Sequence, residues 1–149
     1  MKLMGCELDD AAVQQALTGG LSKADMARVE IRDFVLDPPQ RRFSIVANPP
    51  YIRHHRLGEK LKDKLRAIAK LTIGRPLDGR AGYHIYFLLQ GLQRLAPGGR
   101  LSFIMPADTC EGVFSHVLWK WITTHYCLEH FYFKYLHIQR RRNNLRTRF

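Results

Sequence analysis

The 149-residue sequence contains only three cysteines, and it has no apolar run of the ~18 residues that a membrane-spanning helix needs. The cysteines, Cys6, Cys110 and Cys127, lie far apart and are odd in number. Such spacing disfavours both a disulfide framework and a cysteine-based zinc site. The sequence therefore predicts reduced thiols in a cytoplasmic protein with no membrane partner.

Acidic residues are also scarce, and none follows Glu129. The chain has 24 Lys and Arg against 13 Asp and Glu, which gives a formal net charge of +11. Six of the cations lie after Glu129, and nine lie between Arg53 and Arg80 against three acids. A local basic excess suits a polyanion such as nucleic acid, because neutralised phosphates contribute sequence-independent affinity. An ordinary soluble surface explains the same charge equally well.

Hydrophobic patterning predicts an α/β fold with helical crossovers. The apolar run at residues 43–47 is typical of a strand buried on both faces of a parallel sheet, and residues 100–105 are predicted as another buried strand. Shorter strands are expected at 28–31 and 128–133. Helices are expected at 9–17, 57–71, 83–95 and 113–124, with the turn at 96–99 as a helix stop. Residues 134–149 form a separate basic tail without clear periodicity, either a nucleic-acid-binding arm or, as we favour, a non-native end.

The tetrapeptide Asn48-Pro49-Pro50-Tyr51 directly follows the predicted strand at 43–47. Ligands of open α/β sheets bind at this place, beyond the carboxyl ends of strands. Two consecutive prolines remove two N–H donors, so backbone carbonyls remain free to accept hydrogen bonds. Asn48 adds an amide oxygen and Tyr51 an aromatic face. The four residues suit a planar substrate with an exocyclic amino group, although a polar turn that ends a strand is a simpler alternative.

The segment FSIVANPPYI resembles motif IV of class I S-adenosylmethionine-dependent methyltransferases that act on amino groups. The segment at 5–9 and its following helix resemble motif II, and residues 32–34 resemble motif III. Residues 82–108, GYHIYFLLQGLQRLAPGGRLSFIMPAD, resemble the helix, turn and strand that follow motif IV in the Eco57I/TaqI-like adenine-N6 DNA methyltransferases. The resemblance covers residues 4–133 approximately, in the order that the family has.

This resemblance implies a partial Rossmann-like sheet in residues 1–133 and a methyl transfer from S-adenosylmethionine to adenine N6 in double-stranded DNA. The adenine would be flipped out of the duplex and stacked on Tyr51. Asn48 and the carbonyl of Pro49 would accept the two amino hydrogens, with Pro50 fixing the loop. Catalysis would rest on positioning and hydrogen bonding, without a covalent intermediate.

The resemblance also implies a set of cofactor contacts in addition to Asn48. Glu7 would bind the ribose hydroxyls, Asp33 would meet the adenine amino group of the cofactor, and Phe34 would pack on its ring. The residues directly after the motif are candidates for contacts with phosphates or base edges: Arg53, His54, His55 and Arg56. No metal site is expected, because the spacing around the paired histidines does not support one.

Motif I of the family, a strand ending in a Gly-rich loop, has no counterpart in this sequence. In the family that strand is central and lies between the strands that carry motifs II and IV. No target-recognition domain follows residue 133 either. We therefore interpret the chain as an internal fragment that binds the cofactor poorly and is inactive alone, with the missing segments supplied elsewhere.

Three other functions remain open from the sequence. Glutamine-N5 methyltransferases of release factors also use Asn-Pro-Pro-Tyr, and a glutamine amide is likewise planar. A methyltransferase of structured RNA fits the charge as well as a DNA enzyme does. A non-catalytic, basic nucleic-acid-binding remnant is the alternative outside enzymes. The segment at 103–107 and the basic stretch from Arg53 to Arg80 favour DNA.

Overall fold

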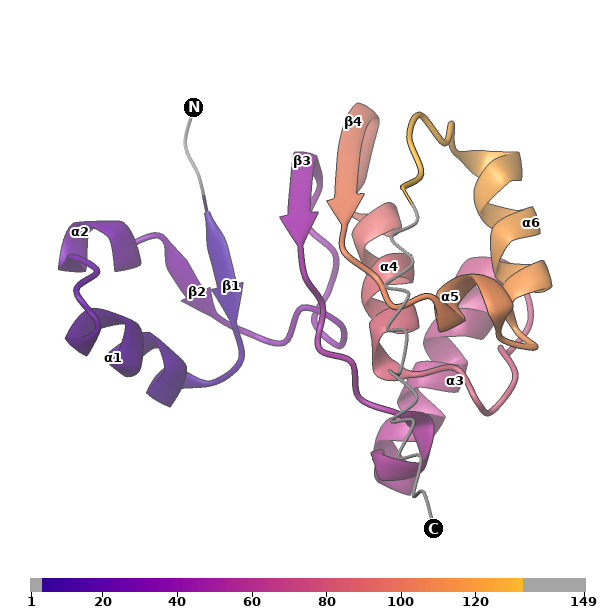
Figure 1. Cartoon of the computed structure of the whole chain (residues 1–149), viewed down its shortest axis with the longest axis horizontal. Helices are drawn as coiled ribbons and strands as arrows, with labels where there is room; N and C mark the ends of the chain where they lie inside the picture. The colour runs from indigo at the N-terminus through magenta and orange to yellow at the C-terminus, as the bar shows by residue number, and fades with distance from the viewer. Residues whose placement is uncertain (1–3, 133–149) are drawn as a thin grey trace, which may run out of the picture.

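The computed structural model describes residues 4–132 and contains two pairs of parallel strands with helices beside them (Figure 1). Strand β1 (Gly5–Glu7) pairs with β2 (Val29–Ile31), and β3 (Arg42–Ala47) pairs with β4 (Leu95–Phe103). Parallel strands need a crossover, and helices lie between the strands of each pair in the chain. The predicted α/β class and helical crossovers are confirmed.

In chain order the described helices are α1 (Asp10–Thr18), α2 (Lys23–Met26), the 3-10 helix η1 (His54–Arg56), α3 (Glu59–Ile73), α4 (Tyr83–Gln93), α5 (Asp108–Glu111) and α6 (Ser115–His125). The four predicted helices correspond to α1, α3, α4 and α6 and lie within two residues of their predicted positions, whereas α2, η1 and α5 were not predicted. Local capping explains several ends. The Asp9 carboxylate accepts a hydrogen bond from the amide of Ala11 at 2.9 Å and so begins α1, and Gly74 ends α3 with a φ of 84°.

Helix α4 forms the centre of the core. Nine of its eleven residues are buried, which is the pattern of a helix covered on all sides. Leu65 of α3 and Leu118 of α6 are fully buried in the same cluster. Because the amide of Tyr83, the first residue of α4, donates to the carbonyl of Ile52, this core holds the first turn of α4 beside the loop that follows β3. In the described part of the chain, no helix is long and apolar enough to cross a membrane.

The two pairs of strands form separate sheets, and β1 is not hydrogen-bonded to β3. This arrangement corrects the prediction that residues 43–47 are buried on both faces. The side chains of Phe43 and Val46 are 76% and 80% exposed, because β3 has a described neighbour along only one edge and no described element covers these side chains. A run of apolar residues therefore lies at an open edge of the sheet.

Two predicted strand boundaries are also wrong. Strand β4 begins at Leu95 rather than at residue 100, and the predicted helix stop is a bulge within it: Arg42 pairs with Leu95, but Ser44 pairs with Arg100. Residues 128–132 lie outside any strand, because no described strand pairs with them, and Tyr132 is 89% exposed. Phe133 and the predicted basic tail at 134–149 lie outside the described residues.

The bulge makes Gly99 a position that cannot accept a side chain. A Cβ there would lie 2.9 Å from the carbonyl oxygen of Ala96 and 3.0 Å from that of Phe43, both of which are backbone atoms. We expect Gly99→Ala to lower the free energy of unfolding by about 1–3 kcal/mol in urea denaturation. Gly79→Ala is the control, because its Cβ would meet only the His54 ring at 3.8 Å. Equal effects of the two substitutions would contradict the predicted clash.

Candidate active site

The Asn-Pro-Pro-Tyr loop is tied to the carboxyl ends of both β3 and β4. The Tyr51 hydroxyl lies within hydrogen-bond distance of Asn48 Oδ1, at 2.7 Å, and of the carbonyl oxygen of Ile104, at 3.0 Å. Ile104 directly follows β4, and its amide donates to the carbonyl of Ala47 at 3.1 Å. The Asn48 amide is therefore held at the edge where ligands of open α/β sheets bind.

The loop presents two acceptors of the kind that an amino group needs. Asn48 is exposed, and its amide oxygen has two lone pairs, of which the Tyr51 hydroxyl takes at most one. The carbonyl of Pro49 accepts no hydrogen bond from residues 4–132. The hydroxyl of Tyr51 thus has a structural role that the sequence did not reveal, since its pattern indicated only an aromatic face.

The first turn of α4 forms the neighbouring wall of the site. The amide of Tyr83 donates to the carbonyl of Ile52 at 2.9 Å, which fixes the loop to the helix. His84 is buried, and its ring meets the Tyr51 ring edge-on with 5.9 Å between the centroids. Its Nε2 lies 3.3 Å from Oδ1 of Asp108, the first residue of α5. Three segments far apart in sequence therefore meet beside Tyr51.

These segments enclose a pocket of about 530 Å³. Its lining residues are Tyr51, Ile52, Arg53, His54, His55, Arg80, Gly82, His84, Pro106 and Asp108. The structure thus brings together three of the four predicted nucleic-acid contacts with Tyr51, whereas Arg56 is not among the lining residues. Arg80, His84 and Asp108 were not singled out from the sequence, because no local pattern relates them to the loop.

Two histidines of the pocket have perturbed acidities. Burial lowers the pKa of His84 below its ordinary 6.5, and the neighbouring Asp108 carboxylate opposes that effect only in part. Burial also lowers the pKa of His54, with the cations Lys62 and Arg66 acting in the same direction. Both rings are therefore mainly neutral at pH 7, when they can accept as well as donate hydrogen bonds.

The lowered pKa of His84 predicts acid sensitivity. The unfolded chain takes up the proton at a higher pH than the folded chain does, so this contribution to stability is complete above pH 6.5 and declines as the pH falls below it. We expect the free energy of unfolding to fall as the pH is lowered from 7.5 to 5. His84→Gln should make its dependence on pH less steep, as measured by denaturation curves across this range. The exposed His116→Gln variant is the control. Identical slopes for wild type and His84→Gln would contradict the prediction.

The two carboxylates predicted to bind the cofactor are each fixed by backbone amides. Glu7, at the end of β1, accepts through Oε1 from the amides of Leu8 at 2.7 Å and Asp9 at 3.1 Å. Asp33 accepts through Oδ1 from the amides of Val35 at 2.8 Å and Leu36 at 2.9 Å. The second oxygen of each carboxylate has no hydrogen bond within the described residues. No recorded contact joins either carboxylate to Asn48 or Tyr51.

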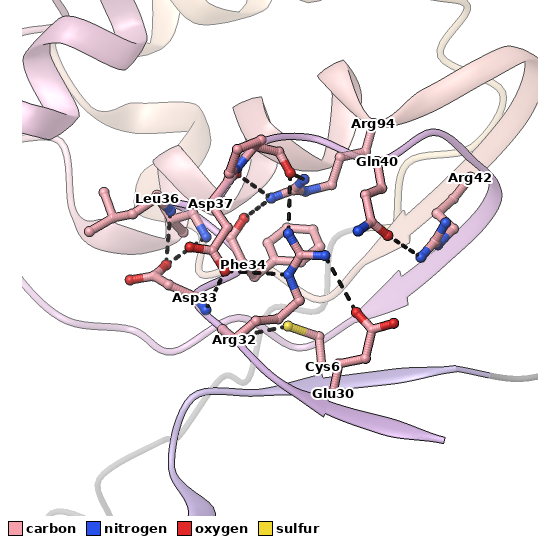
Figure 2. Close-up of polar contacts among 12 residues, drawn as sticks. Cys6, Glu30, Arg32, Asp33, Phe34, Leu36, Asp37, Gln40, Arg42 and Arg94 are labelled. Atoms are coloured by element: carbon pink, nitrogen blue, oxygen red, sulfur yellow. Dashed lines mark hydrogen bonds and ion pairs between the residues drawn. The ribbon is translucent and has the colours of Figure 1, made fainter. Parts of the chain in front are cut away.

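Phe34 and its loop are held by Arg94, a residue that the sequence did not identify. Arg94 follows α4 and is only 4% exposed. Its guanidinium donates to the carbonyls of Phe34, Asp37 and Pro38 and lies 4.5 Å from the centroid of the Phe34 ring (Figure 2). The same ring is stacked on Phe87 of α4 at 5.3 Å. The loop after β2 is thus attached to the core through one buried cation.

No group of three or more potential metal ligands of the His, Cys, Asp or Glu types occurs in the described part of the chain. The polar groups of the pocket instead consist of basic side chains, one carboxylate and a buried imidazole. This set can bind a phosphate at its basic side and can exchange hydrogen bonds with a planar polar group beside Tyr51.

Comparison with known proteins supports the predicted methyltransferase family. The Eco57I restriction-modification methylase family matches residues 38–136, a range that contains the Asn-Pro-Pro-Tyr loop and the whole pocket. Type II methyltransferase M.XhoI of Xanthomonas vasicola is 32% identical to this chain over 126 residues. That match takes in 84% of the chain, and the chain spans only 22% of the length of this curated relative. The chain belongs to the Eco57I restriction-modification methylase family.

Proposed function

We propose that the chain provides the amino-group pocket of a DNA methyltransferase that transfers a methyl group from S-adenosylmethionine to adenine N6. The observation that carries this proposal is the acceptor Asn48 Oδ1, which the Tyr51 hydroxyl contacts at the carboxyl end of β3, with the unpaired Pro49 carbonyl next to it in the chain. An adenine amino group has two hydrogens, so two acceptors match it. The family and its restriction-modification relative support DNA as the substrate.

In the proposed mechanism the target adenine is flipped out of the duplex and stacks on the ring of Tyr51. Asn48 Oδ1 and the Pro49 carbonyl accept its two amino hydrogens, which directs the nitrogen lone pair toward the methyl group. These acceptors also stabilise the positive charge that develops on the nitrogen, and they are already in place before the reaction. The chain thus contributes orientation and electrostatic stabilisation rather than a covalent intermediate.

The residues at the ends of β1 and β2 suit the proposed cofactor. S-adenosylmethionine supplies the methyl group when it is bound. Glu7 would accept hydrogen bonds from the ribose hydroxyls, and Asp33 would accept one from the adenine amino group, each through the carboxylate oxygen that the backbone amides leave free. The predicted packing of Phe34 on that adenine stays a prediction, because its ring is already stacked on Phe87 and covered by Arg94.

We further propose that a strand not contained in the described residues completes the sheet between β1 and β3. The strand would pair with both open edges, and it would cover the exposed side chains of Phe43 and Val46. The much greater length of the M.XhoI relative supports the proposal that further segments, including one for target recognition, act with this chain. Without the strand we expect weak cofactor binding. A calorimetric titration that finds tight binding of S-adenosylmethionine by the 149-residue chain would contradict this.

The proposed activity can be tested by transfer of a radioactive methyl group. The assay uses the chain alone and a form extended at its N-terminus by a family strand and Gly-rich loop. Four substrates are compared: a library of DNA duplexes, duplexes that contain G·C pairs only and therefore no adenine, a structured RNA, and a glutamine-containing release factor. We expect label only in adenine-containing DNA with the extended form. Label in RNA or in glutamine instead would overturn the proposal in favour of those substrates.

A further inference from the structure

The pocket beside Tyr51 contains more polar groups than the proposed transfer reaction uses. Arg53 and Arg80 line it, and no hydrogen bond or ion pair joins the side chain of Arg53 to a residue in the range 4–132. The side chain of Asp108, 66% exposed, is the carboxylate in the lining. Asn48 and Pro49, the proposed acceptors for the target base, are not lining residues. The volume of about 530 Å³ lies in the range of sites for small ligands.

His84 gives independent evidence for a ligand at this place. Its side chain is 5% exposed, and neither ring nitrogen has a hydrogen-bond partner among the described residues. Leaving a buried polar group unpaired costs about 1–3 kcal/mol, and such groups are rare in folded proteins. The 3.3 Å contact between Nε2 and Asp108 becomes an ion pair only when the ring is protonated. The ring nitrogens of His84 are therefore available to form hydrogen bonds with a bound polar group.

The position of the imidazole is fixed by its neighbours. A Cβ on Gly82 would lie 2.6 Å from His84 Cε1, so the ring packs directly on the glycine backbone. On another side the ring meets Tyr51 edge-on at 5.9 Å. Tyr51, His84 and Asp108 thus form one wall of the pocket, which leads from an aromatic ring to a carboxylate. A base that lies against this wall brings a polar edge to Asp108.

Building on the proposed function, we propose that this pocket binds the nucleotide adjacent to the target adenine in the DNA strand. Asp108 accepts a hydrogen bond from an exocyclic amino group of that base, and an unpaired ring nitrogen of His84 forms a hydrogen bond with another polar atom of the same base. Arg53 and Arg80 bind the adjoining phosphate. Thymine has no exocyclic amino group and presents a carbonyl oxygen instead, so the carboxylate selects against it.

The test compares two single-stranded 12-nucleotide homopolymers, oligo-dC and oligo-dT, by fluorescence anisotropy with the 149-residue chain. Both are pyrimidines of equal charge, and they differ at the group that Asp108 would read. We expect about fivefold tighter binding of oligo-dC, the size of one hydrogen bond of about 1 kcal/mol. Asp108→Asn should reduce the ratio to about one, because a rotatable amide can serve either base.

Matched variants separate base reading from charge and folding. Asp10→Asn changes the first residue of another helix and should keep the preference. Arg53→Gln should weaken binding of both oligonucleotides equally, as loss of a phosphate contact does. His84→Gln, which retains a side chain that can form hydrogen bonds with the base, should keep most of the preference, whereas His84→Leu should lose it. Circular dichroism establishes that each variant is folded.

Equal affinity of the wild-type chain for the two oligonucleotides, or a preference that survives Asp108→Asn, overturns this proposal. Its failure can be distinguished from failure of the proposed methyl transfer. Asn48→Ala should abolish transfer and keep the base preference, whereas Asp108→Asn should abolish the base preference. An intact preference with no transfer to adenine in the extended form would overturn the proposed function alone.

Discussion

Replacing Asn48 by alanine is expected to lower the rate of methyl transfer by about 10²–10³-fold, the cost of removing one preorganised group that stabilises a transition-state charge. The amide oxygen is one of the two proposed acceptors for the amino group at the end of β3. The carbonyl of Pro49 alone cannot direct the nitrogen lone pair, because one hydrogen bond leaves the amino group free to rotate. The rate is measured in the extended form by single-turnover transfer to adenine-containing duplex DNA.

The effect should be confined to the chemical step. Asn48→Ala removes the contact to the Tyr51 hydroxyl, but that hydroxyl can still donate to the carbonyl of Ile104, so the loop keeps its attachment to β4. We therefore expect unchanged affinity for DNA and a melting temperature close to that of the wild type. Asn48→Asp retains an acceptor oxygen and should keep most of the activity. The control Gln14→Ala removes an amide from the exposed face of α1. Near-normal turnover by Asn48→Ala would overturn the assignment of this residue.

The sequence alone was sufficient to place this loop, because its pattern is local. A continuous apolar run predicts a strand, and the residues after it lie where ligands bind in a parallel sheet. The parallel pairing of β3 with β4 and the helical crossover between them follow from the same local signals. For the same reason the structure places Tyr51, Arg53, His54 and His55 in one pocket, since they belong to one short segment.

The rest of the site depends on contacts between segments that no local pattern relates. His84 has the helical spacing of a core residue, and only the fold brings it to Asp108 and Tyr51. Phe43 and Val46 were wrongly predicted to be buried. The sequence pattern shows how apolar a strand is, but it does not show whether a neighbouring element covers that strand. The predicted strand at 128–133 failed for a similar reason: strand propensity alone does not supply a partner edge.

Arg94 is the clearest case of a tertiary contact overriding a local expectation, and its replacement has the largest predicted effect on stability. A cation after an apolar helix is normally a solvated end, whereas this guanidinium is buried and serves three carbonyls of the loop after β2. Burial lowers the pKa of Arg94 from its usual high range, but guanidinium stays charged in proteins. The charge is therefore compensated by carbonyl dipoles and by the face of Phe34 rather than by water.

We expect Arg94→Met to lower the free energy of unfolding by about 2–4 kcal/mol in urea denaturation, because hydrogen bonds to a buried charge are lost together and three carbonyls lose a donor. Arg94→Lys should recover less than half of this, since an ammonium group cannot span the three carbonyls that the planar guanidinium reaches. Arg100→Met is the control, because the Arg100–Glu129 pair lies on the surface and should contribute less than about 1 kcal/mol.

The region that Arg94→Met destabilises first shows whether Arg94 holds the loop after β2 or stabilises the core as a whole. Because Arg94 holds the carbonyls of residues 34, 37 and 38, its loss should first release the loop that carries Asp33. Hydrogen exchange should accelerate at the amides of Val35 and Leu36, which donate to Asp33, before it does in α3. Uniform acceleration across the loop and α3 would show that Arg94 stabilises the core as a whole. Selective release would establish that the position of Asp33, and with it the proposed cofactor contact, depends on a cation far away in the sequence.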